Sequence, residues 1–326
     1  MIPKISLANL PTKITKLERL SKAWGVNLYI KRDDQTGSEL SGNKIRKLEY
    51  LLKQALDANC DTLITTGGIQ SNHCRATAVA ATQLGLKCEL LLRVGDEPKI
   101  EGNYFLDKLL GAGISFCNAD EYRDSRDEIM ERIGEKLKRE KGSKCFIIPE
   151  GASNAAGSLG YYEAMVEIAN QEKETSVVFD SIVVAVGSGG TYSGLCTANK
   201  ELKLGKRVIG FAVASNSESF TKIIHEINLA AAKLIGLKSE FSKEDIEIND
   251  KYVGVGYAIS RPEELSFIRE IASSEALILD PVYTGKAMYG LYNEIKEGRV
   301  PQGSNVLFIH TGGLFGLFPK QDQFTF

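Results

Sequence analysis

A glycine-rich turn in the second half of the chain has the residue types of a phosphate-binding site. An apolar run, residues 181–186, leads directly into Gly187, Ser188, Gly189, Gly190 and Thr191, and a helical pattern follows. Small residues let backbone N–H groups approach an anion closely, and the start of a helix adds partial positive charge. The turn is neither a Walker loop, since no Lys follows the last glycine, nor a GxGxxG motif. We interpret it as a phosphate-binding turn, with a ligand-free tight turn as the alternative.

Lys44 is a second candidate for chemistry. It follows Ser41, Gly42 and Asn43 and begins a helical pattern. A lysine that forms a Schiff base must be partly desolvated, because its amine reacts in the neutral form. Most lysines are solvated surface charges, and this stretch alone does not separate the two cases.

Three further clusters of polar residues follow apolar runs. The first contains Gln70, Ser71, Asn72 and His73 at the start of a helical pattern, where free N–H groups would receive a carboxylate. Helix capping by Ser71 or Asn72 is the alternative. The other two are DPVYTGK, residues 280–286, and FIHTGG, residues 308–313. Ligands of open α/β sheets bind beyond the carboxyl ends of the strands, so we expect these clusters to meet at one site.

Short apolar runs alternate with helical patterns along the chain. The expected strands are residues 61–66, 87–93, 114–117, 144–149, 181–186, 207–214, 276–279 and 305–310. The expected helices include residues 103–110, 122–141 and 157–171. This alternation indicates βαβ units and parallel sheets buried on both faces. We predict an α/β protein with open, doubly wound parallel sheets, and a polar surface excursion at residues 239–250.

Composition narrows the classes of protein. The chain has 326 residues, 43% hydrophobic and 25% charged, which fits one large or two coupled globular domains. A net charge of −2 offers no basic field for nucleic acid or anionic lipid. We see no transmembrane stretch and no apolar signal-peptide core, and the six cysteines lack zinc spacing. We therefore expect a cytoplasmic protein with reduced thiols and no metal site.

Taken together, the motifs resemble the fold-type II pyridoxal-phosphate (PLP) enzymes. The closer likeness is to the branch that contains 1-aminocyclopropane-1-carboxylate (ACC) deaminase and D-cysteine desulfhydrase. The motifs are KRDD, GNKIRKLEY, GGIQSNH, GNYFLDKLLGA, GSGGTYSG, DPVYTGKA and HTGG, in the order of the family. The resemblance implies two doubly wound parallel-sheet domains of the tryptophan synthase β type. A large PLP-binding domain would comprise residues 1–47 and 161–326, and a small inserted domain residues 48–160.

The resemblance also implies roles for single residues. Lys44 would carry PLP covalently with Asn43 beside it, and Gly187, Ser188, Gly189, Gly190 and Thr191 would hold the phosphate. Asn72 would face the ring hydroxyl of PLP, and Ser71, Asn72 and His73 would meet the substrate carboxylate. Lys44, Ser71, Tyr257 and Tyr283 would be the catalytic residues. Lys44 or a tyrosine would remove the α-proton.

Two positions bear on the substrate. Thr284 and Thr311 stand where ACC deaminases have Glu and Leu, and D-cysteine desulfhydrases have threonine at both, so the two would contact the cofactor. A carboxylate at the pyridine nitrogen would favour the protonated ring and a stronger electron sink than a hydroxyl does. Expelling a thiolate, whose reference pKa is about 8.5, needs less help than opening a cyclopropane.

The resulting expectation is α,β-elimination of D-cysteine to pyruvate, sulfide and ammonia by a PLP-dependent homodimer. Small amino acids would be its substrates. The alternatives are L-cysteate sulfo-lyase activity, ACC deaminase activity and a non-catalytic PLP-binding relative. A nucleotide-binding α/β protein is a further alternative from another class.

Overall fold

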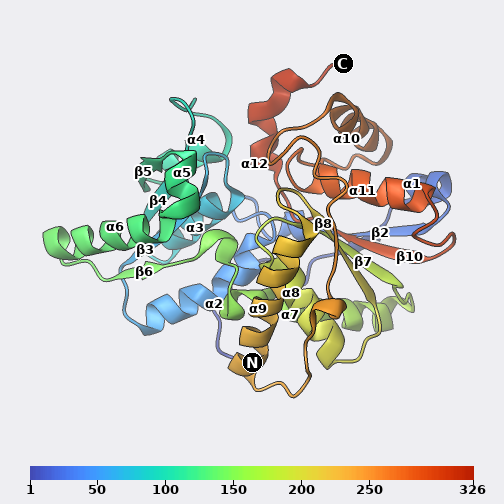
Figure 1. The fold of residues 1–326 in the computed structure, drawn as a ribbon, viewed down its shortest axis with the longest axis horizontal. Helices are drawn as coiled ribbons and strands as arrows, with labels where there is room; N and C mark the ends of the chain where they lie inside the picture. Colours follow the sequence, from blue (N-terminus) through green and yellow to red (C-terminus); the bar gives the residue numbers. More distant parts are fainter.

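Two β-sheets organise the computed structural model, which describes residues 1–326 (Figure 1). The larger sheet has six strands in the order β1-β2-β10-β7-β8-β9, and the smaller has four in the order β5-β4-β3-β6. The strands are β1 (Ile14–Lys16), β2 (Asn27–Lys31), β3 (Thr62–Gly68), β4 (Lys87–Arg93), β5 (Gly113–Cys117), β6 (Cys145–Ile147), β7 (Ser181–Val186), β8 (Arg207–Ala212), β9 (Glu247–Asn249) and β10 (Asn305–Ile309). All neighbours pair parallel except β1 with β2. The α/β class with two parallel sheets is therefore confirmed.

Helices cover both faces of each sheet, as a doubly wound fold requires. They are α1 (Glu18–Trp24), α2 (Lys44–Asp57), α3 (Asn72–Gln83), α4 (Gly102–Leu109), α5 (Ala119–Asp124), α6 (Arg126–Lys141), α7 (Ala155–Thr175), α8 (Gly190–Glu201), α9 (Ser217–Ile235), α10 (Pro262–Glu275), α11 (Thr284–Lys296) and α12 (Leu314–Leu317). Short 3-10 helices occupy Asp33–Gln35, Glu150–Ala152, Lys243–Asp245 and Phe318–Gln323.

The sequence of the central strand β7 is apolar throughout, and the packing on its two faces explains why. Ile182 and Val184 belong to the hydrophobic core on one face, with α7, α8 and α9. Val183 and Ala185 belong to the core on the opposite face, with α1, α10 and α11. Because both faces are buried, a parallel strand needs a continuous apolar run instead of an alternating one.

The smaller sheet repeats this arrangement. Leu63 of β3 packs with α2 and α3 on one face, whereas Ile64 packs with α6 on the other. All four of its strands lie between residues 62 and 147, which places them inside the inserted domain expected from the sequence. The boundaries at residues 47/48 and 160/161 stay a prediction. Both fall inside continuous helices, the first in α2 and the second in α7.

Two expectations about elements were wrong. Residues 276–279 form no strand: Leu277 and Leu279 are apolar because they enter the core between α10 and α11, while Ile278 is exposed. The expected helix at residues 122–141 is two helices, α5 and α6, which meet at Ser125. The polar excursion at residues 239–250 contains the edge strand β9, which pairs with β8.

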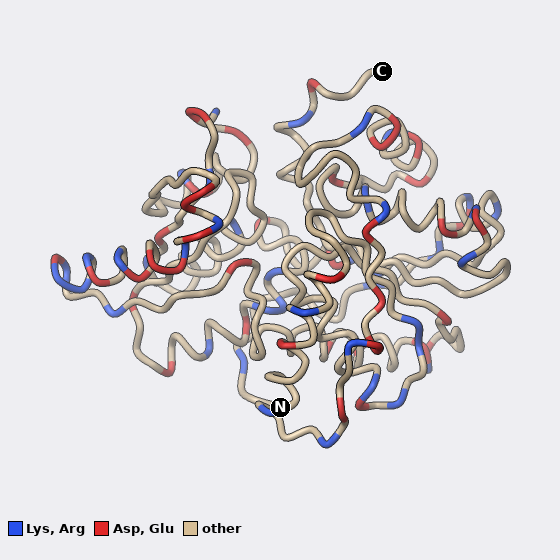
Figure 2. Tube along the Cα trace, viewed as in Figure 1, with Lys and Arg blue, Asp and Glu red and all other residues tan.

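Charged residues of both signs are mixed along the chain, and both signs alternate along α6 (Figure 2). This mixture accords with the net charge of −2. No helix combines the length and the apolar character that crossing a membrane requires.

Candidate active site

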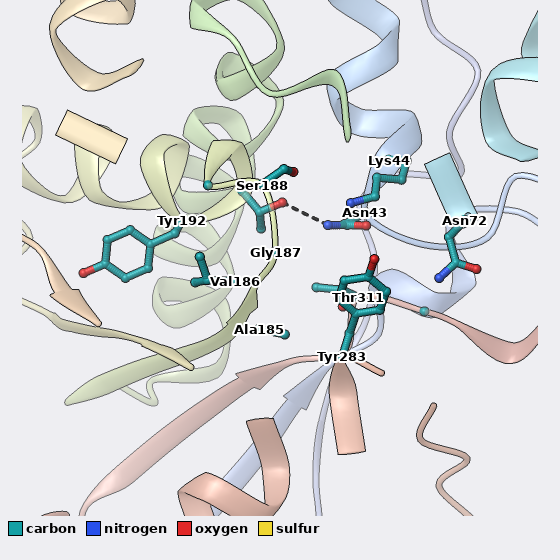
Figure 3. Close-up of a pocket in the computed structure, with 13 residues that line it drawn as sticks. Asn43, Lys44, Asn72, Ala185, Val186, Gly187, Ser188, Tyr192, Tyr283 and Thr311 are labelled. Carbon is teal, nitrogen blue, oxygen red and sulfur yellow. Dashed lines mark hydrogen bonds between the residues drawn. The ribbon is translucent and has the colours of Figure 1, made fainter. Parts of the chain in front are cut away.

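A cavity of about 410 Å³ lies where the carboxyl ends of β7 and β10 meet the start of α2 and α3 (Figure 3). Its lining contains Asn43, Lys44, Asn72, Ala185, Val186, Gly187, Ser188, Gly189, Thr191, Tyr192, Tyr283, Thr311 and Gly312. The strand ends of the two sheets thus bring together residues that are far apart in the sequence. This is the position that the topology of open α/β sheets favours for a ligand.

Lys44 is placed by close packing of two glycines. Gly42 and Gly312 have φ values of 108° and 86°, which favour glycine. A Cβ atom at Gly312 would lie 2.7 Å from Cα of Gly42, so neither backbone could approach the other with a side chain between them. The N–H of Asn43 donates to the carbonyl of Thr311. The loop before Lys44 is therefore fixed against the end of β10.

A buried ion network holds α2 in the same place. The Arg46 guanidinium donates two hydrogen bonds of 2.9 Å to the Asp33 carboxylate and also pairs with Glu167 of α7. The N–H of Gly42 donates to the carbonyl of Asp33. Asp33 belongs to the KRDD motif and Arg46 to the GNKIRKLEY motif. Their ion pair therefore explains why each motif contains a charged residue at that position. Arg46 lies two residues after Lys44 and anchors the first turn of the helix.

The amine of Lys44 faces the cavity and lies 5.8 Å from the ring centre of Tyr283. Burial lowers the pKa of Lys44 to about 8, although Glu150 and Asp280 act in the opposite direction. A pKa near 8 leaves a useful fraction of neutral amine at physiological pH. The environment therefore supplies the desolvation that the sequence alone could not show.

The glycine turn lies opposite Lys44. Gly189 has a φ of 85°, and a Cβ atom at Gly187 would meet the Tyr283 ring at 3.0 Å. The amide of Asn43 donates a 2.9 Å hydrogen bond to the Thr191 hydroxyl, which ties the turn to the residue before Lys44. The amino end of α8 follows and adds partial positive charge. The turn thus combines the features that hold a phosphate.

Two residues near the turn were missed by the sequence reasoning. The Lys47 ammonium is fully buried, has no acidic partner and donates to the Ser153 hydroxyl at 3.1 Å. Ser153 in turn contacts the Ser188 hydroxyl at 2.8 Å and accepts from the N–H of Gly190. Burial and the nearby Lys44 lower the pKa of Lys47 well below its ordinary value. Burying the Lys47 charge without an acidic partner costs free energy, and a phosphate dianion held by the turn would offset that cost. The residues present therefore fit the phosphate of PLP.

The GGIQSNH cluster forms the start of α3. Ser71 caps the helix, accepting a hydrogen bond from the N–H of Cys74 at 3.1 Å, as the capping alternative proposed. The Asn72 side chain lines the cavity and accepts from Asn103 at 3.0 Å. The backbone N–H of Asn103 donates to the side-chain oxygen of Gln70 at 2.9 Å. The GNYFLDKLLGA motif, which contains Asn103, therefore orients the groups that would meet a substrate carboxylate.

His73 has a defined protonation state. The Thr65 hydroxyl donates its only proton to the carbonyl of Ile148, so the contact of 2.8 Å with His73 requires Nε2–H of the ring as donor. Burial, with the nearby Lys44 and Lys47, lowers the pKa of His73 well below its ordinary value. The neutral ring leaves Nδ1 as a buried acceptor without a partner. His73 would therefore offer a carboxylate its backbone N–H and not its ring.

Tyr257 and Tyr283 come together beside Lys44. Their hydroxyl groups lie 2.6 Å apart, and both residues line a second cavity of about 970 Å³ that continues from the first. Ser71 and His73 line the second cavity too. Burial is the main cause that raises the pKa of each tyrosine. Both hydroxyls therefore keep their protons near neutral pH.

The two threonines differ in their placement. Thr311 lines the first cavity, whereas Thr284 is fully buried and lines neither. The Thr284 hydroxyl donates to Oδ1 of Asp280 at 2.7 Å and accepts from its N–H. Asp280 also receives the N–H groups of Val282 and Tyr283. Thr284 therefore shapes the DPVY turn, and its expected contact with the cofactor stays a prediction.

Comparison with known proteins agrees with this geometry. Residues 5–312 match the family model described as pyridoxal-phosphate dependent enzyme. A bifunctional D-cysteine desulfhydrase/ACC deaminase of Arabidopsis thaliana is 43% identical over 98% of this chain and 80% of its own. A D-cysteine desulfhydrase of Klebsiella pneumoniae is 39% identical over 97% of this chain and 95% of its own.

Comparison with solved structures points to the same family of enzymes. The crystal structure of an ACC deaminase homologue superposes with a TM-score of 0.90, at 42% identity over 98% of this chain and 95% of that one. O-ureido-L-serine synthase, at 17% identity and a TM-score of 0.64, shares the fold. With the geometry of the Lys44 cavity and these relatives, the chain belongs to the family of pyridoxal-phosphate-dependent enzymes, on the branch of D-cysteine desulfhydrases and ACC deaminases.

Proposed function

We propose that the protein converts D-cysteine and water to pyruvate, ammonia and sulfide by α,β-elimination. The observation that carries this choice is the lining of the first cavity. Thr311 faces it at the end of β10, and no carboxylate lines it. A hydroxyl favours protonation of the pyridine nitrogen less than a carboxylate does. This setting suits the expulsion of a thiolate better than the opening of an unactivated ring.

PLP, when bound, supplies the electron sink that lets the α-carbon lose a proton. In this proposal Lys44 holds the cofactor and the turn at residues 187–191 holds its phosphate with Lys47. The start of α3 receives the substrate carboxylate, and Asn72 faces the cofactor ring. The Lys44 amine, when it is not bonded to the cofactor, would be the base that takes the α-proton. Its pKa of about 8 suits a base that works near neutral pH.

The tyrosine pair would serve the leaving sulfur. Tyr283 borders both cavities and keeps its proton, so it can donate to sulfur as the bond to the β-carbon breaks. Tyr257 would orient that proton through its 2.6 Å contact with the Tyr283 hydroxyl. Departure as hydrosulfide or hydrogen sulfide then needs no other acid. The aminoacrylate released from the site hydrolyses to pyruvate and ammonia.

The experiment is sulfide release from D-cysteine and L-cysteine by the purified, PLP-loaded protein, with pyruvate measured in parallel. Release from the D-isomer with equal pyruvate supports the proposal. Lys44→Ala must abolish it together with the visible absorption of the bound cofactor. No sulfide from either isomer would refute the proposal and direct attention to L-cysteate, ACC or a non-catalytic role.

ACC deamination is the second candidate function, because the names of several relatives include this activity. It would give 2-oxobutyrate and ammonia from ACC, which a single assay of the same preparation distinguishes from pyruvate. We also propose that the protein is a homodimer of the cytoplasm, where its six free cysteines would stay reduced. Light scattering of the purified protein tests the first statement, and cell fractionation the second.

A further inference from the structure

One cation borders the second cavity without a carboxylate partner. Arg93 is the last residue of β4 in the smaller sheet and lines this cavity. The two other arginines of the cavity wall form ion pairs, Arg123 with Asp120 and Asp124, and Arg126 with Asp127 and Glu150. Because arginine stays protonated in proteins, Arg93 is a permanent positive charge at this wall.

The neighbours of the Arg93 guanidinium are two aromatic rings. Its central carbon lies 5.0 Å from the ring centre of Tyr122 and 5.5 Å from that of Tyr257. At these distances a guanidinium is attracted to the face of the ring. Tyr122 also faces Arg126, at 5.3 Å, whereas Arg93 is the only cation at the Tyr257 ring. The charge of Arg93 therefore acts on Tyr257 in particular.

Tyr257 belongs to the loop between β9 and α10 and shares a hydrogen bond with Tyr283. The two hydroxyl oxygens are 2.6 Å apart, and either hydroxyl can be the donor. If Tyr283 donated, its proton would point at Tyr257; if Tyr257 donates, the Tyr283 proton is free for the cavity. A cation beside a phenol stabilises the phenolate and so strengthens the phenol as a donor. Arg93 therefore favours the arrangement in which Tyr257 donates to Tyr283.

The charged groups around the two tyrosines act unequally. Burial raises the pKa of both, and that of Tyr283 is raised well above its ordinary value. Among the charged groups near Tyr257, Glu150 and Asp280 raise its pKa as burial does. The Arg93 guanidinium and the hydrogen bond with Tyr283 lower it. Of the pair, Tyr257 thus gives up its proton more readily.

We propose that Arg93 is a positioning residue that makes Tyr257 the reserve proton donor of the site. As the bond between the β-carbon and sulfur breaks, its electron pair leaves on sulfur, and Tyr283 gives its O–H proton to that sulfur. Tyr257 passes its own proton to the Tyr283 oxygen, and the Arg93 cation stabilises the phenolate that remains. The α-proton is then on Lys44, and a proton from solvent in the second cavity, which Tyr257 lines, restores the phenol.

This role rests on the proposed function, which supplies the leaving sulfur and the neutral Lys44 amine. The amine lies 5.8 Å from the ring centre of Tyr283 and gains its charge only with the α-proton. Until then Arg93 is the permanent cation of the tyrosine pair. The direction of the hydrogen bond between the tyrosines is therefore set before the sulfur leaves.

Two leaving groups of different basicity test the role. Elimination from D-cysteine and from β-chloro-D-alanine gives pyruvate and ammonia in both cases, but chloride leaves without a proton. With D-cysteine, Arg93→Met should lower kcat by about tenfold and change KM less, because the donor to sulfur loses its support. With β-chloro-D-alanine the loss should be about twofold or less. In a Tyr257→Phe background, Arg93→Met should cost little more, because the two residues act as one unit.

Titration of Tyr257 is a readout that needs no turnover. Fluorotyrosine replaces tyrosine in the PLP-loaded protein, because ring fluorine makes every phenol more acidic and brings its titration within reach. The fluorine NMR signal that is absent from Tyr257→Phe belongs to residue 257. Its pKa should rise by about one pH unit in Arg93→Met, the effect of removing one charge at a partly buried site.

Arg123→Met is the matched control, because Arg123 lines the same cavity but is exposed and already paired. It should keep the wild-type kinetics and titration. Arg93→Lys, which preserves the charge, should retain most of both, and circular dichroism verifies that each variant is folded.

Three results would overturn the proposal: an unchanged titration of Tyr257 in Arg93→Met, a wild-type rate of this variant with D-cysteine, or equal losses with the two substrates. Absence of sulfide release from D-cysteine by the wild type would instead refute the proposed function. The titration would then still decide whether Arg93 acts on Tyr257.

Discussion

The hydroxyl groups of Tyr257 and Tyr283 lie 2.6 Å apart beside the amine of Lys44. Tyr283 directly precedes the helix α11, and its N–H donates to the Asp280 carboxylate. Tyr257 belongs to a loop whose carbonyls at Val253 and Gly256 accept from the buried ammonium of Lys286. Separate hydrogen bonds thus hold the two residues in place: Tyr283 as a proton donor at the cavity, and Tyr257 as the group that orients its hydroxyl.

Tyr283→Phe should reduce sulfide release from D-cysteine by about 10²- to 10⁴-fold, because the leaving sulfur loses its proton donor. Tyr257→Phe should cost less, since Tyr257 acts through Tyr283, and both should change kcat more than KM. Steady-state kinetics provides the measurement. Tyr292→Phe is the control, because Tyr292 packs against Trp24 in the core and lines neither cavity. A wild-type rate in Tyr283→Phe would exclude this role.

Lys47 should matter for the phosphate of the cofactor and not for its ring. Lys47→Met removes the buried cation beside Ser153 and Ser188, so it should weaken binding of PLP to the apoprotein by about tenfold or more. Binding of pyridoxal, which lacks the phosphate, should be nearly unchanged. Titrations followed by visible absorption give both affinities. A similar loss with the two compounds would mean that Lys47 supports the fold of the turn instead.

The pH dependence of cofactor loading should report the state of Lys44. Only the neutral amine adds to an aldehyde, and the pKa of Lys44 is lowered to about 8. The rate of loading of the apoprotein should therefore rise about tenfold for each pH unit below 8 and level off above it. Stopped-flow absorbance measures this profile. A rise that continued to the ordinary lysine value of 10.5 would show that burial does not act on this amine.

The same lowered pKa predicts the sign of a stability change in the apoprotein. The unfolded chain binds the Lys44 proton up to about 10.5, but the folded chain releases it near 8. Between these values the unfolded state binds more protons, so the contribution of Lys44 to folding stability rises with pH. Below about 8 the contribution is constant. Urea unfolding of the wild type and Lys44→Met across this window should differ in slope accordingly.

A contact within the site could be predicted from the sequence only where its two residues lie close together along the chain. The strand before the turn at residues 187–191 and the helix after it were predicted correctly, because strand, turn and helix are contiguous there. That the turn binds a phosphate stays a prediction. Lys47 and Ser153 are 106 residues apart, and neither belongs to a local pattern, so only the folded chain shows their contact.

A local pattern also misled in one place. Residues 276–279 form a continuous apolar run, which fits a buried strand, but Leu277 and Leu279 serve helix packing and form no ladder. The residue types were compatible with two environments, and long-range packing decided between them. The contact of Thr284 with the cofactor stays a prediction, and in this structure its hydroxyl donates to Asp280.

The network around Arg46 yields the last prediction. Arg46→Met leaves the fully buried Asp33 carboxylate without its main partner, and removing one member of a buried pair costs about 3–5 kcal/mol. Urea unfolding of the apoprotein should show this loss. Arg32→Met is the matched control, since the Arg32–Asp34 pair is partly exposed and should contribute about 1 kcal/mol or less. Because α2 carries Lys44, the Arg46 variant should also load PLP more slowly. Equal stability of the two variants would show that the network does not anchor α2.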